Sequence, residues 1–147
     1  KVDPEKRMLF NPAESIDFNG NTGPFIQYTY ARIQSVVKKG NSMEELKGKA
    51  FDFATFSSMN DKEKMVVKSI LDYPFALQTA ADKYAPSIIA NYVYELAKNY
   101  NQFYHENPIV DKSQLETTAF RIYLSKVTGD IIKKSLLLLG IQVPERM

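Results

Sequence analysis

The chain has 147 residues, of which 44% are hydrophobic, so it is long and apolar enough to bury the core of one domain. Cysteine is absent, which excludes a disulfide framework, a thiolate metal site and a cysteine nucleophile. The longest apolar runs, such as 136–139, are too short to span a bilayer, and we expect no contact with a membrane. The formal net charge of +2 at pH 7 is smaller than that of a general nucleic-acid-binding protein.

Residues 1–20 hold two prolines, two asparagines and an isolated glycine, and they predict an irregular leading segment. The chain begins at Lys1 rather than at a methionine, and charged residues follow where a secretory signal would be apolar. We interpret the chain as a piece of a longer protein, in which residues 1–20 link the missing part to a helical domain over 21–147.

A first helix is predicted over 22–39. Thr22 can cap its start, and Pro24 falls in the first turn, where the missing N–H does no harm. Gly40 follows as a stop.

Positive charge gathers at the end of this helix. Lys38 and Lys39 form a cationic last turn, and from Arg32 to Lys49 five basic residues stand against two acidic ones. A solvated helix end would explain this excess equally well, so charge alone does not establish RNA binding.

The middle of the chain is predicted as a connection over 40–60, with a short helix near 42–47, and two helices after it. Asn60 can cap the first of these helices, and Glu63 completes a capping box. Pro74 marks the boundary with the second helix. The apolar positions expected to carry that second helix are Phe75, Leu77, Ala80, Ala81 and Tyr84.

Two long helices complete the pattern. Pro86 opens one that runs to about His105 with a broad apolar and aromatic stripe. The other covers 114–139 and contains Gly129, which costs about 1 kcal/mol relative to alanine. Gly140 ends it in a Schellman-type stop. Four to five main helices without an alternating strand pattern predict an all-α helical bundle.

Catalytic signatures are missing from this pattern. The chain has no nucleophile elbow, phosphate-binding loop or dinucleotide fingerprint, so we predict no catalytic residue. His105 is the single histidine, and without cysteine it is a poor start for a transition-metal site, so we predict no metal. Its place at a helix end favours an interaction with the helix dipole.

Aromatic residues are abundant, with nine tyrosines and nine phenylalanines. Most of them would serve the core, with the tyrosine hydroxyls reaching water. The alternative use is stacking on unpaired bases while arginine and lysine hold phosphates. The predicted helix over 22–39 supplies both kinds of group: Tyr28, Tyr30, Arg32, Lys38 and Lys39.

Three stretches resemble the anticodon-binding domain of arginyl-tRNA synthetases. The run 16–33, IDFNGNTGPFIQYTYARI, is similar to the G-N/D-T-G/A-P-Y-x-Q-Y-x-x-x-R pattern at the start of that domain. The stretch 92–97, with the aromatic pair 103–104 beyond it, looks like its central helix. Residues 138–147 look like its C-terminus, which ends in Glu-Arg-Met. The three matches stand in order and cover nearly the whole chain.

The resemblance implies an all-α domain of the DALR type that binds the anticodon arm of arginine tRNA. The catalytic domain of such an enzyme would lie upstream of Lys1 and pack with this piece. The parent would be a cytoplasmic, monomeric arginine–tRNA ligase that uses ATP and Mg²⁺, whereas the piece itself would hold no cofactor.

The same resemblance implies the residues that contact tRNA. Tyr28 and Arg32 match the Q-Y-x-x-x-R pattern, and Tyr104 matches an aromatic that stacks on an anticodon base. Two residues depart from the family pattern. Phe25 replaces the commoner tyrosine, and Lys38 is a point charge that lacks a guanidinium fork. The full set of tRNA-binding residues expected is Phe25, Tyr28, Arg32, Lys38, Tyr104 and Met147.

Two other classes of function stay open at this point. A helical protein-interaction or dimerisation module would use the tyrosines for a partner helix and would not bind RNA. A self-contained enzyme is disfavoured because no catalytic constellation is present.

Overall fold

The computed structural model describes residues 11–12, 20–46 and 58–147. Within these ranges the chain is helical and forms no strand, which confirms the predicted all-α bundle. Most of the predicted leading segment 1–20, and residues 47–57 of the predicted connection 40–60, lie outside the described residues. The elements are α2 (Gly23–Asn41), the 3-10 turn η1 (Glu44–Leu46), α3 (Asp61–Leu71), α4 (Tyr73–Asp82), α5 (Pro86–Glu106) and α6 (Leu115–Leu138).

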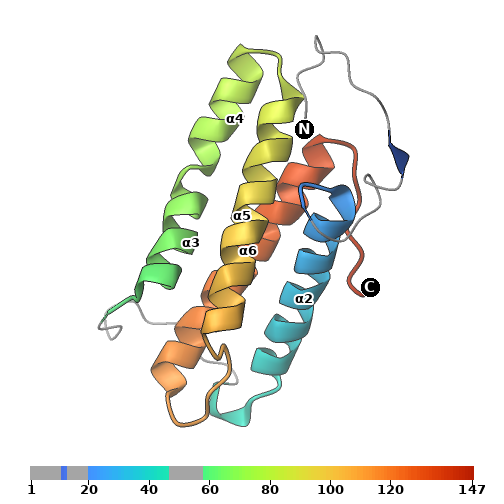
Figure 1. The fold of residues 1–147 in the computed structure, drawn as a ribbon. Coiled ribbons are helices and arrows are strands. Elements are labelled where there is room, and N and C mark those ends of the chain that lie inside the picture. The colour runs from blue at the N-terminus through green and yellow to red at the C-terminus, as the bar shows by residue number, and fades with distance from the viewer. Residues whose placement is uncertain (1–10, 13–19, 47–57) are drawn as a thin grey trace.

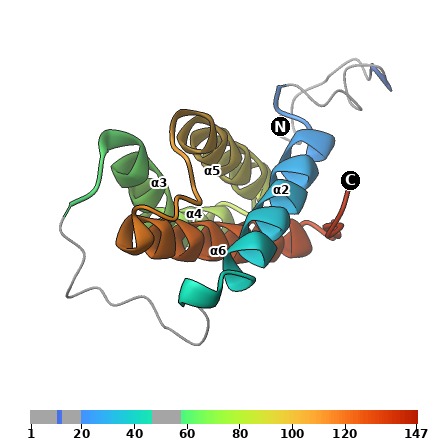
Figure 2. The same cartoon turned by 90° about the horizontal axis from the view of Figure 1, so that it is seen from below.

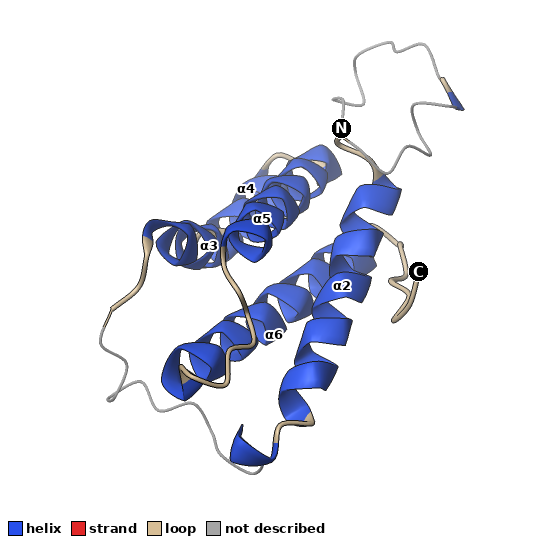
Figure 3. Cartoon of the chain, turned by 60° about the horizontal axis from the view of Figure 1, so that its bottom comes forward, coloured by secondary structure: helices blue, strands red, loops and turns tan. Residues whose placement is uncertain are grey.

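Helix α5 is the centre of the bundle, since it contacts α2, α3, α4 and α6. Helices α3 and α4 follow one another along one side of α5 (Figure 1). Seen from below, α6 runs past α3, α5 and α2 in turn (Figure 2). After α6 the C-terminal tail returns alongside α2 (Figures 1 and 3).

The core lies where the apolar face of α5 meets its neighbours. Leu96, Tyr100 and Phe103 of α5 are fully buried, as are Ile33 of α2 and Ile132 of α6. Burial of this apolar area, at roughly 25 cal/mol per Å², is the main force that holds the helices together. No helix in the described ranges combines the length and the apolar character that a membrane span needs.

The local signals at three helix ends are confirmed. The Thr22 hydroxyl accepts a hydrogen bond from the Phe25 N–H at 3.3 Å. Asn60 and Glu63 make both bonds of the capping box, at 2.8 and 2.9 Å. Gly140 has a φ of +73°, in the left-handed region that favours glycine. The two bonds of a Schellman motif accompany it, from Gly140 N–H to Leu137 O and from Ile141 N–H to Leu136 O.

Two glycines play a different part from the one expected. Gly40 does not stop the first helix, because α2 continues through it to Asn41. A Cβ at Gly40 would overlap the side chain of Ile122, and a Cβ at Gly129 would lie 2.9 Å from Cγ2 of Ile33. These glycines therefore allow α2 and α6 to pack closely, and α6 continues through Gly129 without a break.

Helix α4 buries only part of the apolar set predicted to carry it, since Ala80 is buried as expected but other members of that set are exposed. Its buried residues are Ala76 and Ala80, whereas Phe75 is 75% exposed and Tyr84, beyond the helix end, is 93% exposed. The apolar positions of this short segment fit two helical faces, and only the packing against α5 selects one.

Candidate nucleic-acid interface

A hollow of about 490 Å³ opens between α2, the end of α5 and the C-terminal tail. A hydrogen bond of 2.7 Å from Gln27 Nε2 to the carbonyl of Gln142 fastens the tail to the start of α2. We call this space the first hollow. Its lining residues are Tyr28, Ala31, Arg32, Ser35, Val36, Lys39, Tyr104, Arg146 and Met147.

Arg32 lies between two aromatic rings in the first hollow. Its guanidinium carbon is 5.0 Å from the ring centroid of Tyr28 and 4.9 Å from that of Tyr104. Both distances suit a cation–π interaction. One planar cation and two rings are thus brought together from helices that are far apart in the sequence.

A chain of hydrogen bonds fixes the Arg32 side chain. Its Nη1 donates to Oδ1 of Asn101 at 2.6 Å. Asn101 Nδ2 donates to the hydroxyl of Thr29 at 2.8 Å, and that hydroxyl donates to the carbonyl of Phe25 at 2.9 Å. Because Thr29 is fully buried, the far end of this chain cannot shift easily. The guanidinium is therefore held in one orientation before any ligand binds.

The rim of the first hollow is cationic. Lys39 and Arg146 line it, and Arg146 also lines a second hollow of about 320 Å³ beside it. Lys38 lies in that second hollow, together with Glu145. Positive charge next to aromatic rings is typical of sites that bind unpaired nucleotides.

Four of the six residues expected to bind tRNA line the first hollow: Tyr28, Arg32, Tyr104 and Met147. Lys38 lines the adjoining second hollow. Phe25 does not line either one, because it is half-buried against the core, with its ring 5.5 Å from that of Tyr94.

Three further residues of the site, Asn101, Lys39 and Arg146, are not among those that the resemblance implies, although Lys39 is one of the cations that the helix over 22–39 offers for phosphates. Lys39 and Arg146 stood within stretches that the resemblance and the local charge had already marked. Asn101 carried no signal, because its importance rests on a bond to a residue 69 positions away.

The described residues contain no group of three or more histidine, aspartate or glutamate side chains that would hold a metal ion. His105 lies in the last turn of α5, as the helix-dipole interpretation requires. Its ring meets that of Tyr104 edge-on at 5.9 Å.

The helical bundle and its hollow define the chain as a small all-α domain with an aromatic and cationic site suited to single-stranded RNA. Residues 26–147 match the family described as "DALR anticodon binding domain". The chain therefore belongs to the DALR anticodon-binding domain family.

Similar proteins agree with this membership. All of the chain matches the arginine–tRNA ligases of Flavobacterium psychrophilum (50% identity, 23% of that protein) and Parabacteroides distasonis (48% identity, 24%). The structure superimposes on the arginyl-tRNA synthetase of Thermus thermophilus with a TM-score of 0.84 and 27% identity, over 98% of this chain and 24% of that one. The chain thus spans about a quarter of the length of the curated relatives it matches.

Proposed function

We propose that this chain is the part of an arginine–tRNA ligase that binds the anticodon arm of arginine tRNA, and that the first hollow is where it does so. The observation that supports the proposal most directly is Arg32, held between the rings of Tyr28 and Tyr104 beside a cationic rim. Unpaired bases stack on such rings, while arginine and lysine neutralise the phosphates between them.

Each residue of the site makes a different contact with the RNA in this proposal. Tyr28 and Tyr104 supply faces for a splayed anticodon base, and Arg32 supplies a planar cation that stacks or bonds to it. Met147, which is 56% exposed, adds an apolar contact from the tail. Lys38, in the second hollow, attracts the backbone of the loop. Phe25 contributes by packing behind the site, and its predicted contact with tRNA stays a prediction.

The rest of the enzyme supplies the chemistry in this proposal. The relatives are about four times as long as this chain, which leaves room for a catalytic domain that packs with it and uses ATP and Mg²⁺. We propose that the whole ligase works as a monomer in the cytoplasm. This chain would orient the tRNA, and no step of the ligation would use its side chains.

Binding to RNA hairpins tests the proposal. A hairpin with the sequence of an arginine tRNA anticodon arm should bind this chain, and raising the salt concentration should weaken the complex. A hairpin with the same stem and an unrelated loop serves as the matched control and should bind less tightly. Replacing Tyr104 by alanine should remove most of the difference between the two, at a cost of about 1–3 kcal/mol.

Two other outcomes would contradict this proposal. If the chain binds both hairpins equally, loop recognition by the first hollow is wrong. If it binds no RNA and self-associates in a way that does not depend on salt, a protein-interaction module is the better description.

A further inference from the structure

A third hollow of about 300 Å³ lies beside the first one, between the end of α2 and the segment that joins α5 to α6. Both parts lie at the lower end of the bundle in Figure 1. Its size is at the lower end of the range for small-ligand sites. The lining residues are Val36, Lys39, Tyr104, Asn107, Pro108, Ile109 and Val110.

The third hollow shares a wall with the first. Tyr104, Lys39 and Val36 line both spaces, so a ligand in one lies next to a ligand in the other. Lys39 stands at the shared boundary, where it can meet a negative charge that joins two such ligands. Consecutive nucleotides of a single strand have this arrangement, with a base on each side of a connecting phosphate.

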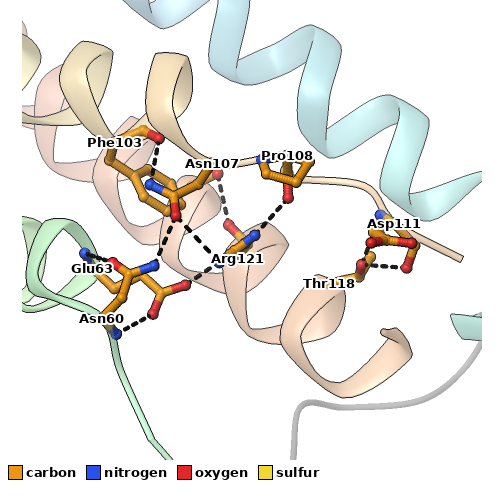
Figure 4. Close-up of polar contacts among 9 residues, drawn as sticks. Asn60, Glu63, Phe103, Asn107, Pro108, Asp111, Thr118 and Arg121 are labelled. Atoms are coloured by element: carbon orange, nitrogen blue, oxygen red, sulfur yellow. Dashed lines mark hydrogen bonds and ion pairs between the residues drawn. The ribbon is translucent and has the colours of Figure 1, made fainter. Parts of the chain in front are cut away.

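The outer wall of the third hollow, residues 107–110, is fixed at its first end. Arg121 donates to the carbonyl of Pro108 at 2.7 Å and to Oδ1 of Asn107 at 3.3 Å (Figure 4). Arg121 itself is held by Glu63, 2.7 Å away, and the Glu63 side chain is only 3% exposed. Asn60 donates to the same Asn107 oxygen at 2.7 Å.

The wall is also fixed at its other end. The Thr118 hydroxyl accepts from the Asp111 N–H at 2.9 Å and donates to the Asp111 carbonyl at 2.8 Å (Figure 4). Between the two ends, Ile109 is buried in the core and Val110 packs against it. The hollow is therefore formed before a ligand arrives, and little ordering entropy is lost on binding.

We infer that the third hollow is a second nucleotide subsite, which takes the base adjacent to the one bound in the first hollow. This inference rests on the proposed function. The base contacts the apolar wall of Val36, Pro108 and Val110, and Lys39 meets the phosphate between the two nucleotides.

The polar groups of the wall also indicate how far the subsite can discriminate between bases. Both ends of the Asn107 amide are engaged within the protein, the oxygen with Asn60 and Arg121 and the nitrogen with the carbonyl of Phe103. Apolar contact and stacking tolerate any base. We therefore expect this subsite to require a base but to accept substitution of one base for another.

Single cysteines provide the first test, because the chain has no cysteine of its own. Val110→Cys places a thiol in the third hollow, and Ala81→Cys places one on the exposed side of α4, away from all three hollows. Saturating amounts of the arginine anticodon hairpin should slow maleimide labelling at position 110 at least about fivefold and leave position 81 unchanged. Equal labelling rates at position 110 with and without bound hairpin would overturn the subsite.

Hairpins that lack one loop base give the second test. Removing the base at either of two adjacent loop positions should weaken binding of the hairpin to wild-type protein about 5- to 100-fold. Val110→Trp, which fills the third hollow, should weaken binding of the intact hairpin about tenfold. In this variant, removing one of the two bases should have no further effect on affinity, whereas removing the other should still weaken binding. Ala81→Trp, which adds the same side chain on the exposed side of α4, lines none of the three hollows and should bind the hairpin as wild type does. Circular dichroism checks that both variants fold.

The two proposals fail in different ways. If wild-type protein prefers the arginine hairpin but only one loop position matters, and Val110→Trp binds as wild type, the second subsite is wrong and the proposed function stands. If wild-type protein shows no preference for the arginine hairpin, the proposed function fails first.

Discussion

Arg32 and Asn101 are joined by a hydrogen bond of 2.6 Å between Nη1 and Oδ1, although 69 residues separate them in the sequence. Asn101 is held in turn by the buried Thr29, so the bond orients the guanidinium as well as pairing it. A cation with a fixed orientation loses less entropy when it binds a nucleotide than one that must be ordered first.

Replacing Asn101 by alanine should therefore weaken RNA binding more than it weakens the fold. We expect a loss of about 1 kcal/mol in the free energy of unfolding, because one hydrogen-bonded network is removed. The affinity for the arginine hairpin should fall about tenfold. Asn99→Ala is the matched control, since Asn99 lies on the same helix but donates to Ser69 on α3. A similar loss of RNA affinity in both variants would mean that Asn101 acts only through stability.

Lys39 should determine part of the salt dependence of RNA binding. If Lys39 neutralises a phosphate, Lys39→Gln lowers the slope of log Kd against log salt by about one. Lys68→Gln removes an exposed charge on α3, outside the three hollows, and should leave the slope unchanged. Titrations of the hairpin at several salt concentrations measure both slopes, and a Lys39→Gln slope equal to that of wild type contradicts the assignment.

Arg121→Met should destabilise the protein by about 3–5 kcal/mol, because it leaves the charge of Glu63 buried without its partner. The double variant Glu63→Gln/Arg121→Met should recover part of this loss, since glutamine can keep the capping box without a charge. Lys64→Met, which breaks the exposed pair of Lys64 with Asp61, should cost less than about 1 kcal/mol. Urea unfolding measures all three, and equal costs for Arg121→Met and Lys64→Met would refute a special role for the buried pair.

Gly129→Ala should destabilise the protein although alanine is the better helix former. The gain in helix propensity is about 1 kcal/mol, whereas the new methyl group would meet Cγ2 of the buried Ile33, and overpacking of this kind costs about 1–3 kcal/mol. Ile33→Leu lacks that branched methyl group, so the double variant should lose less than the sum of the two single variants. Thermal unfolding of the four proteins gives the coupling, and additive losses would show that the two sites do not touch.

The stability of the fold should fall at high pH because of Tyr100. Burial raises the pKa of its hydroxyl above the usual value of 10.0, and the hydrogen bond to Ser125 opposes only part of this effect. The unfolded chain therefore loses this proton at a lower pH than the folded one. The stabilisation is fully present below pH 10 and declines as the pH rises above it. Burial raises the pKa of Tyr92 in the same direction.

Tyr100→Phe removes one of these protons. Above about pH 10, the slope of the free energy of unfolding against pH should become shallower by up to about 1.4 kcal/mol per pH unit. Ser125→Ala loses the same hydrogen bond but keeps the tyrosine, so its slope should stay steep. Urea unfolding between about pH 9 and 11 distinguishes the two variants. An unchanged slope in Tyr100→Phe would show that other groups govern the alkaline transition.

Most of the helix ends can be predicted from neighbouring residues alone. Thr22, the pair Asn60 and Glu63, and Gly140 act through bonds within one helical turn, so neighbouring residues suffice to predict them. The run 16–33 and the Glu-Arg-Met ending also sufficed to indicate the family.

The contacts between distant side chains, in contrast, depend on how the helices pack. Glycine within a helical pattern ordinarily predicts an interruption or an end of the helix. Gly40 and Gly129 instead allow close contact, because α6 packs against α2 there. Asn101 is an unremarkable polar residue of α5 until packing brings it to Arg32. The physical reason is that helix capping is settled within a few residues, whereas the site depends on which faces of separate helices are buried together, and that choice is made by the whole core.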